Sequence, residues 1–257
     1  MNKQIQTIKF KCMKKQFIFL FSLLGLVFTA CEKNDPASDG NEQEEVKDIK
    51  QFVNVAAGQT AIPDYGQLPG TSAKFKVGDE ISIYSWKNAK DDTSDAISNI
   101  YILNEDGWTP KTENDSMFWE KSNEQLYFAA VYPTREIQDL KADKMTTNDT
   151  DILVSNIMNG VKPQEDAIRF TFTHLFSKVV MNFTYGTEHP ETNFTEKTVT
   201  LKNIASKGFY NHLDKTAVPS EEKEDFTLTQ DGEKSTFYGI IFPQEMSEIQ
   251  FSGKIED

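Results

Sequence analysis

The chain has 257 residues, of which 27 are Lys or Arg and 40 are Asp or Glu, so its formal net charge is −13. A chain this acidic repels nucleic acids and anionic headgroups, and its composition disfavours DNA and RNA binding. Its length allows one large domain or two of ordinary size, and its 19 phenylalanines supply material for their cores.

The first 30 residues have the three parts of a signal peptide. Five lysines and no acidic residue come first, a largely apolar run of 12 residues occupies residues 17–28, and the small residues Thr29 and Ala30 follow. The apolar run is shorter than the roughly 20 residues that a permanent membrane helix needs. We therefore predict a signal peptide at residues 1–30.

The residue after this segment is a cysteine in a characteristic setting. Phe28-Thr29-Ala30-Cys31 resembles a lipobox, the site where bacterial lipoproteins are cut and acylated, although Phe28 stands where leucine is commoner. Each buried methylene of an acyl chain contributes about 0.8 kcal/mol, so several chains on Cys31 would hold the protein on a membrane. We predict cleavage between Ala30 and Cys31 and lipid attachment at Cys31. An uncleaved anchor helix and an ordinary secretory signal with a free Cys31 are the alternatives.

Residues 31–50 are rich in Pro, Gly, Ser, Asn and Glu and poor in apolar side chains. Too little surface can be buried there to offset the entropy of ordering, so we predict a flexible acidic tether. An acidic stretch behind a lipidated cysteine also resembles the export tag of surface lipoproteins in some Gram-negative bacteria. That resemblance implies a surface-exposed chain on the cell outer membrane, with placement on the inner leaflet as the alternative.

Removal of residues 1–30 changes both the charge and the thiol content. Five lysines are lost, which takes the basic residues from 27 to 22 and the net charge from −13 to −18. Cys12 leaves with the signal, and Cys31 is acylated. The mature fold then has no thiol for a disulfide, a zinc site or a nucleophile, and its stability must come from packing.

Beyond residue 50, apolar and polar residues alternate with a period of two, which indicates strands. A first predicted strand turns Val77 and Ile81 to one face and Tyr84 to the other. The almost wholly apolar residues 124–133 predict a strand that is covered on both faces. Asp-Gly pairs within residues 104–108 and 229–233 predict tight hairpins, because glycine tolerates the positive φ of such turns. One short helix is predicted at residues 136–144.

The alternation changes phase in residues 169–186. Phe170 and Phe172 lie on one parity, whereas Leu175 and the apolar residues that follow lie on the other. A slip of one residue inverts the faces of a strand, so the chain must bulge, bend or pass to another sheet there. We interpret this point as the handover between an N-terminal domain at residues 51–165 and a C-terminal domain at residues 166–257. The short strands downstream are spaced as in a β-sandwich.

Five segments, in order along the chain, together resemble the fimbrillin (Mfa-like) family of surface lipoproteins. They are residues 74–86, 99–110, 117–133, 151–156 and 168–183. The resemblance implies two β-sandwich domains of transthyretin-like Greek-key type, and a fimbrial (pilus) subunit that contributes to adhesion. In this family an Arg-specific protease removes an N-terminal strand of the precursor, and a C-terminal strand of a neighbouring subunit fills the groove. Such strand addition replaces the main-chain hydrogen bonds and side chains of the lost strand.

The arginines depart from this family pattern. Only Arg135 and Arg169 are present, and neither lies in the N-terminal part where processing is expected. We therefore expect an anchor or accessory subunit that stays lipidated and whose partners are other fimbrial subunits and a host or bacterial surface ligand. Family members usually continue beyond the last strand of this chain, so a short member and a truncated reading frame both remain open.

No catalytic or metal-binding motif stands out. The histidines are far apart and lack metal-ligand spacing, at His174, His189 and His212. No nucleophile or phosphate-binding motif occurs, so we expect no enzyme, no cofactor and no metal. An acidic loop with Asp91, Asp92 and Asp95 carries oxygen ligands suited to calcium, but it lacks the glycine and glutamate of an EF-hand. We predict a solvated loop, and we expect His174 to be a partly buried polar residue.

Two further features concern carbohydrate. Exposed tryptophans would stack on sugars, so Trp86, Trp108 and Trp119 are what a glycan-binding outer-membrane lipoprotein, the alternative function, would need. Buried tryptophans that fill a sandwich core are the interpretation that we favour. Asp115-Ser116-Met117 resembles the Asp-Ser/Thr-apolar site at which some bacteria O-glycosylate exported proteins, which makes Ser116 a candidate glycosylation site.

Overall fold

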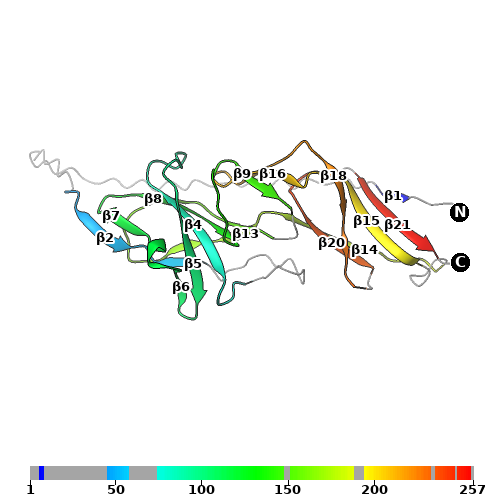
Figure 1. Cartoon of the computed structure of the whole chain (residues 1–257), viewed down its shortest axis with the longest axis horizontal. Coiled ribbons are helices and arrows are strands. Elements are labelled where there is room, and N and C mark those ends of the chain that lie inside the picture. The colour runs from blue at the N-terminus through cyan, green and yellow to red at the C-terminus, as the bar shows by residue number, and fades with distance from the viewer. Residues whose placement is uncertain are drawn as a thin grey trace, which may run out of the picture.

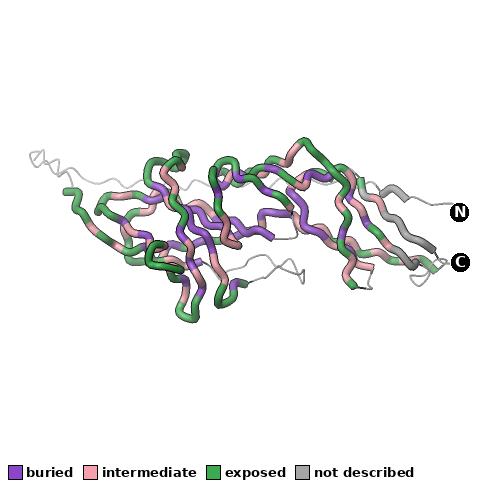
Figure 2. Tube along the Cα trace, in the orientation of Figure 1, coloured by how far each residue is buried: buried purple, intermediate pink, exposed green. Residues whose placement is uncertain are grey.

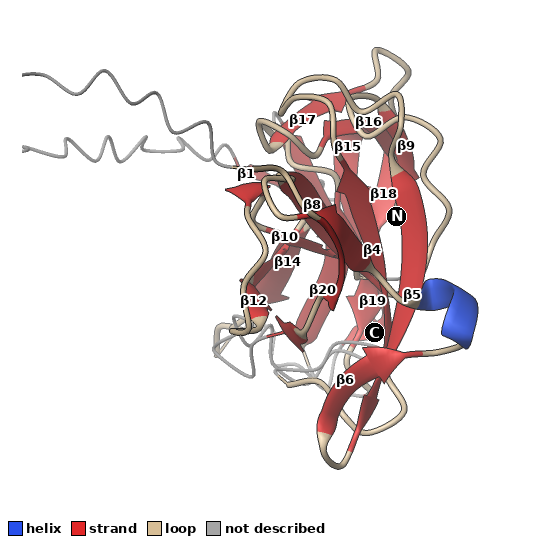
Figure 3. Cartoon of the chain, turned by 90° about the vertical axis from the view of Figure 1, so that its left-hand side faces the viewer, coloured by secondary structure: helices blue, strands red, loops and turns tan. Residues whose placement is uncertain are grey.

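The computed structural model describes residues 6–8, 45–57, 74–147, 151–187, 194–232, 235–246 and 248–255. In these ranges the molecule is elongated and consists almost entirely of strands (Figure 1). The helical element that they contain is one 3-10 turn, η1 (Glu113–Asp115), which lies at the margin beside β5 (Ile97–Asn104) (Figure 3). The prediction of an all-β fold is confirmed.

A large sheet forms the centre of the N-terminal half, with the strand order β13-β10-β8-β4-β5-β6 and β11 paired to β8. Besides β5, its strands are β4 (Glu80–Trp86), β6 (Gly107–Pro110), β8 (Leu126–Tyr132), β10 (Leu153–Ser155), β11 (Met158–Val161) and β13 (Phe172–His174). Strand β8 lies in the middle of this sheet and is buried on both faces, as its apolar sequence predicts.

Two short strand pairs complete the N-terminal sandwich. One pairs β2 (Asp48–Phe52) with β7 (Phe118–Lys121), and the other pairs β3 (Val55–Ala57) with β12 (Ile168–Phe170). Apolar side chains from these pairs and from the large sheet form the first core. Its fully buried members include Val53, Ile81, Ile83, Tyr101, Trp119 and Phe128.

The C-terminal sandwich has two smaller sheets with the orders β14-β20-β19 and β1-β21-β15-β18. Their strands are β14 (Ser177–Asn182), β19 (Thr229–Gln230), β20 (Thr236–Ile241), β1 (Gln6–Ile8), β15 (Phe194–Ile204), β18 (Glu224–Thr227) and β21 (Glu248–Ile255). Side chains of β15 and β20, with Leu228, form the third core between the sheets. Strand β1 comes from the predicted signal peptide and pairs antiparallel with β21.

A middle core joins the two sandwiches. It covers the face of the large sheet that is turned away from the first core, and includes Tyr84, Val131, Phe176, Ile240 and Phe242. A three-stranded sheet with the order β17-β16-β9 contributes side chains to the middle core. Its strands are β9 (Asp143–Thr146), β16 (Lys207–Asn211) and β17 (Thr216–Pro219). Figure 2 shows the buried stretches continuing through the middle of the molecule.

The middle core explains two differences from the predicted pattern. The face of β4 that carries Tyr84 is as buried as the other face, because the C-terminal half covers it. The predicted helix at residues 136–144 is wrong: these residues form bends and turns that lead into β9. Ile137 and Leu140 are buried in the middle core, and the Ile137 N–H donates to the Tyr84 hydroxyl at 2.7 Å, so tertiary contacts outweigh helix propensity.

Other predictions concern turns and the change of sheet. Both Asp-Gly hairpins are confirmed, with positive φ at Gly107 (126°) and Gly232 (60°). The prediction that Val77 lies in a strand, on the same face as Ile81, is wrong, because Val77 lies in a turn before β4 and is 66% exposed. The phase change near Leu175 is confirmed as a passage between sheets, because β13 pairs with β10 and β14 pairs with β20. The division into two domains at residue 165 stays a prediction.

Candidate functional site

The N-terminal segment, residues 45–57, is the candidate site for strand exchange. Its strand β2 runs antiparallel to β7, with Asp48 opposite Lys121 and Phe52 opposite Phe118. Its strand β3 then runs parallel to β12. In Figure 1, β2 begins at one end of the elongated molecule and points inward, so the segment leads from the tip toward the body of the sandwich.

Buried side chains and backbone hydrogen bonds hold this segment in place. Val53 has no exposed surface, and its N–H donates to the Met117 carbonyl at 2.9 Å. The Asn54 carbonyl accepts from the Ile168 N–H at 2.9 Å, and the Ala57 carbonyl accepts from Trp108 Nε1 at 3.3 Å. Removal of the segment would therefore open the first core and leave buried donors without acceptors.

Both arginines lie in ordered structure far from this segment in sequence. Arg169 is exposed at the centre of β12, opposite Ala56 of β3. Arg135 follows β8, and its guanidinium donates to the Asp143 carboxylate at 2.9 Å and to the Lys144 carbonyl at 3.0 Å. Residues 45–57 contain no arginine. An Arg-specific protease thus has no site among the described residues that precede the large sheet.

A charged network sits beside the middle core, and the sequence alone did not reveal it. The Asp143 carboxylate accepts from Arg135 at one oxygen, and its other oxygen lies 3.0 Å from Nε2 of His212. The side chains of Asp143 and His212 are 4% and 3% exposed. Because Asp143 is in β9 and His212 follows β16, the network connects residues that are 69 positions apart in the sequence. It fixes the connection between the two sandwiches.

A second buried pair links His174 to Asp151, through Nδ1 and a carboxylate oxygen. The two side chains are 3% and 4% exposed, so the histidine is buried as a polar partner, in line with its prediction. Among the described residues, no group of three or more His, Cys, Asp and Glu side chains is placed to hold a metal ion. His189 lies outside the described residues.

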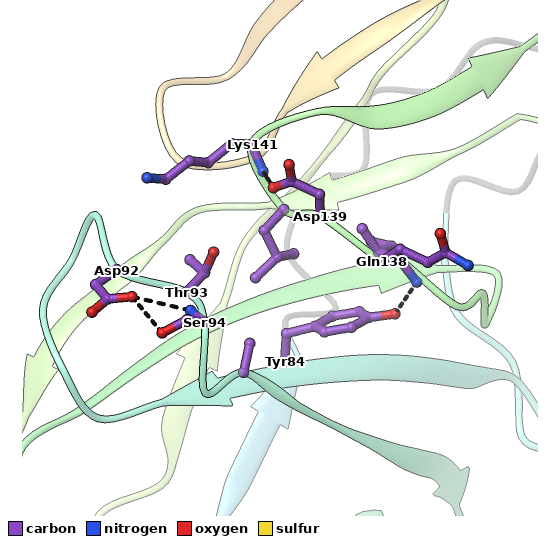
Figure 4. A pocket seen from close by; sticks show the side chains of 10 residues that line it. Tyr84, Asp92, Thr93, Ser94, Gln138, Asp139 and Lys141 are labelled. Atoms are coloured by element: carbon purple, nitrogen blue, oxygen red, sulfur yellow. Dashed lines mark hydrogen bonds between the residues drawn. The ribbon is translucent and has the colours of Figure 1, made fainter.

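A pocket of about 430 Å³ lies between the acidic loop and the connection that follows β8 (Figure 4). Asp92, Ser94 and Asp139 line it together with Tyr84. The hydroxyl and N–H of Ser94 donate to Asp92 and lower the pKa of that carboxyl. Burial raises the pKa of Tyr84, whose hydroxyl donates to the Arg135 carbonyl at 2.7 Å.

Two acidic side chains of this loop, those of Asp92 and Asp95, accept hydrogen bonds from nearby backbone N–H groups. Asp95 accepts from the Lys87 N–H at 3.0 Å, Asp92 is satisfied by Ser94, and Asp91 is exposed. These contacts fit the loop predicted from the sequence and place no three carboxylates around a common point.

The three tryptophans are buried, as we favoured. Trp86, Trp108 and Trp119 are 1%, 9% and 0% exposed, and each indole N–H donates to a backbone carbonyl, of Ala89, Ala57 and Val161 respectively. They fill cores and offer no stacking surface, so the feature on which a glycan-binding function rested is not found.

Of the remaining predicted site residues, the structure describes Ser116 but not Ala30 and Cys31. Ser116 is half-buried directly after η1, and the Asp115 carboxylate beside it accepts from the Ile100 N–H at 2.8 Å and from Thr112. Burial opposes these hydrogen bonds, yet the net effect lowers the pKa of Asp115. Ala30 and Cys31 lie outside the described residues. No helix in the described ranges is both long and apolar enough to span a bilayer.

Comparison with known proteins decides the family. The model of the fimbrillin-like family matches residues 70–256, which is most of the chain and covers the strands from β4 to β21. The chain belongs to the fimbrillin-like family. No curated protein matches it.

Solved structures of Bacteroides proteins resemble this fimbrillin-like chain. A candidate cell adhesion protein of Bacteroides uniformis aligns with a TM-score of 0.56 and 20% identity, over 75% of this chain and 74% of that one. A second, of Bacteroides ovatus, aligns with a TM-score of 0.46 and 18% identity, over 79% and 80%. At this level of identity, the first comparison shows a shared fold.

Proposed function

We propose that this fimbrillin-like protein is a cell-surface lipoprotein that anchors fimbriae or serves as an accessory subunit in them, and contributes to adhesion. The observation that carries the proposal is the match of residues 70–256 to the fimbrillin-like family. The solved relative from B. uniformis, described as a candidate cell adhesion protein, supports the adhesive role. The proposed location is the outer surface of the outer membrane.

The anchor role rests on the N-terminal segment. In a subunit that accepts a neighbour's strand, the groove is vacated when the N-terminal strand is cut away. Here Val53 and Ala57 fill the first core, and the segment has no arginine at which an Arg-specific protease could act. The groove therefore keeps its own strand, and the protein joins a fimbria by donating a strand or by docking, at the membrane end of the filament.

The predicted lipid attachment at Cys31 is compatible with the proposed anchor role. Acylation at Cys31 after cleavage behind Ala30 would leave 14 residues, 31–44, before the described segment begins at Glu45. Such a stretch spans at most about 50 Å when fully extended. Because β2 starts at one end of the molecule, the lipid would hold that end toward the membrane and the C-terminal sandwich away from it (Figure 1). We also propose Ser116 as an O-glycosylation site, since part of its surface is exposed.

Mass spectrometry of protein isolated from the cell surface tests this proposal. We expect an N-terminus at Cys31 with acyl chains, and an N-terminus in the fifties or later without acyl chains would contradict it. Lys47→Arg is the informative variant, because residue 47 is exposed just before β2. In cells with an Arg-specific protease, this variant loses its lipid, whereas the matched Lys47→Gln variant keeps it.

A further inference from the structure

The parallel pairing of β3 with β12 has a mechanical consequence. Register positions join Val55 to Ile168, Ala56 to Arg169 and Ala57 to Phe170. In a parallel pair, the N-terminal ends of both strands lie at the same end. A pull on the N-terminal end of β3 and a counter-pull on the C-terminal end of β12 thus act at opposite ends of one ladder.

Tension along the chain acts on the β3–β12 ladder from these two opposite ends. Toward the N-terminus, β3 continues into β2 and the predicted lipid tether. Toward the C-terminus, β12 continues through Thr171 into β13 and then into β14 of the C-terminal sandwich. Force between the membrane and a distal partner that is passed on beyond the β2–β7 pair loads β3 in the sliding direction along β12. Sliding breaks the bonds of the ladder together, whereas peeling breaks them one after another.

Further contacts strengthen both ends of this ladder. At its start, the Asn54 side-chain amide donates to the Glu165 carbonyl at 3.0 Å, and the Asn54 carbonyl accepts from Ile168. At its end, Trp108 donates to the Ala57 carbonyl. Sliding would also drag Val53, which is fully buried, through the first core.

We propose that the β3–β12 pair is a shear clamp, which makes the N-terminal sandwich resist tension along the chain more strongly than it resists peeling. In shear the load is shared over the three register positions, whereas in peeling a single position carries it. The role of the clamp in the cell rests on the proposed anchoring at Cys31, but its resistance to force does not depend on a lipid. It would keep the subunit folded while an attached filament is pulled.

Single-molecule pulling on the unacylated mature chain, residues 31–257, tests the clamp. One handle is the thiol of Cys31, and the other is a cysteine at either end of β12, from Asp166→Cys or Thr171→Cys. Both positions are exposed, and they lie on either side of β12. The Cys31–171 geometry shears β3 against β12, and the Cys31–166 geometry peels the same bonds from their common end. Pairing of β2 with β7 is loaded in both and cancels in the comparison.

We expect the event that releases β3 to need about two- to threefold more force in the shear geometry at equal pulling speed, because the same bonds share the load. Equal melting temperatures of the two variants show that direction, not stability, is responsible; Glu165→Cys replaces Asp166→Cys if that variant melts earlier. Equal forces, or a lower force in shear, would overturn the clamp. A Cys31 that is never acylated in cells would defeat the anchor role and leave the force ratio unchanged.

Discussion

Truncation of Val53 to alanine measures how firmly the N-terminal segment belongs to the first core. The change removes two methyl groups from a side chain with no exposed surface. At about 0.8 kcal/mol for each buried carbon, the transfer term is about 1.6 kcal/mol. The cavity that remains raises the expected loss in the free energy of unfolding to about 2 kcal/mol. Val46→Ala is the matched control, because Val46 lies in the same segment and is 50% exposed.

Urea unfolding of the mature chain, followed by tryptophan fluorescence, is the assay. Trp108 and Trp119 lie in the core that Val53 fills, so their emission reports on that core. We expect a lower midpoint with an unchanged m-value for Val53→Ala, and a shift below about 0.5 kcal/mol for Val46→Ala. Equal effects of the two substitutions would show that the segment is not part of the core, and the reasoning behind the anchor role would fail.

Three further changes test the middle core and the buried polar groups. Gly208→Ala should cost about 1–3 kcal/mol in thermal unfolding, because its Cβ would lie 2.6 Å from the Phe242 ring; wild-type stability would contradict that contact. Asp143→Asn leaves Arg135 without its counter-charge and should cost about 3–5 kcal/mol by urea unfolding, whereas a loss below 1 kcal/mol would show that the network is dispensable. Burial raises the pKa of Tyr101 to about 12 from 10.0, so its contribution to stability is complete below pH 10 and is lost between pH 10 and about 12. Tyr101→Phe should flatten the fall in melting temperature over that range, and an unchanged slope would exclude this group.

Local patterns in the sequence predicted most strands but not the way in which they are covered. The Asp-Gly turns and the apolar run of β8 act over a few residues, so the sequence displays them directly. The second buried face of β4 depends on side chains such as Phe242, which lie more than 150 residues away in the chain. The alternation in β4 separates the Tyr84 face from the Ile81 face, but it does not reveal that Ser82 and Tyr84 are buried as well.

Contacts between residues far apart in the sequence explain both the charged network around Asp143 and the wrongly predicted helix at residues 136–144. Arg135, Asp143 and His212 come together only because β9 pairs with β16, and no spacing in the sequence marks them as partners. Ile137 and Leu140 are spaced as on a helix, yet the Ile137 N–H donates a hydrogen bond to the Tyr84 hydroxyl. The phase change near Leu175 was informative because it records a change of sheet within a single continuous segment.

Acylation of Cys31 is the central claim, and metabolic labelling with a palmitate analogue tests it most directly. The chain offers a matched control, since its other cysteine, Cys12, lies in the predicted signal peptide. We predict that the wild-type protein and a Cys12→Ser variant are labelled equally and that a Cys31→Ser variant is not labelled. A wild-type protein as unlabelled as the Cys31→Ser variant would contradict a lipid-anchored fimbrial subunit.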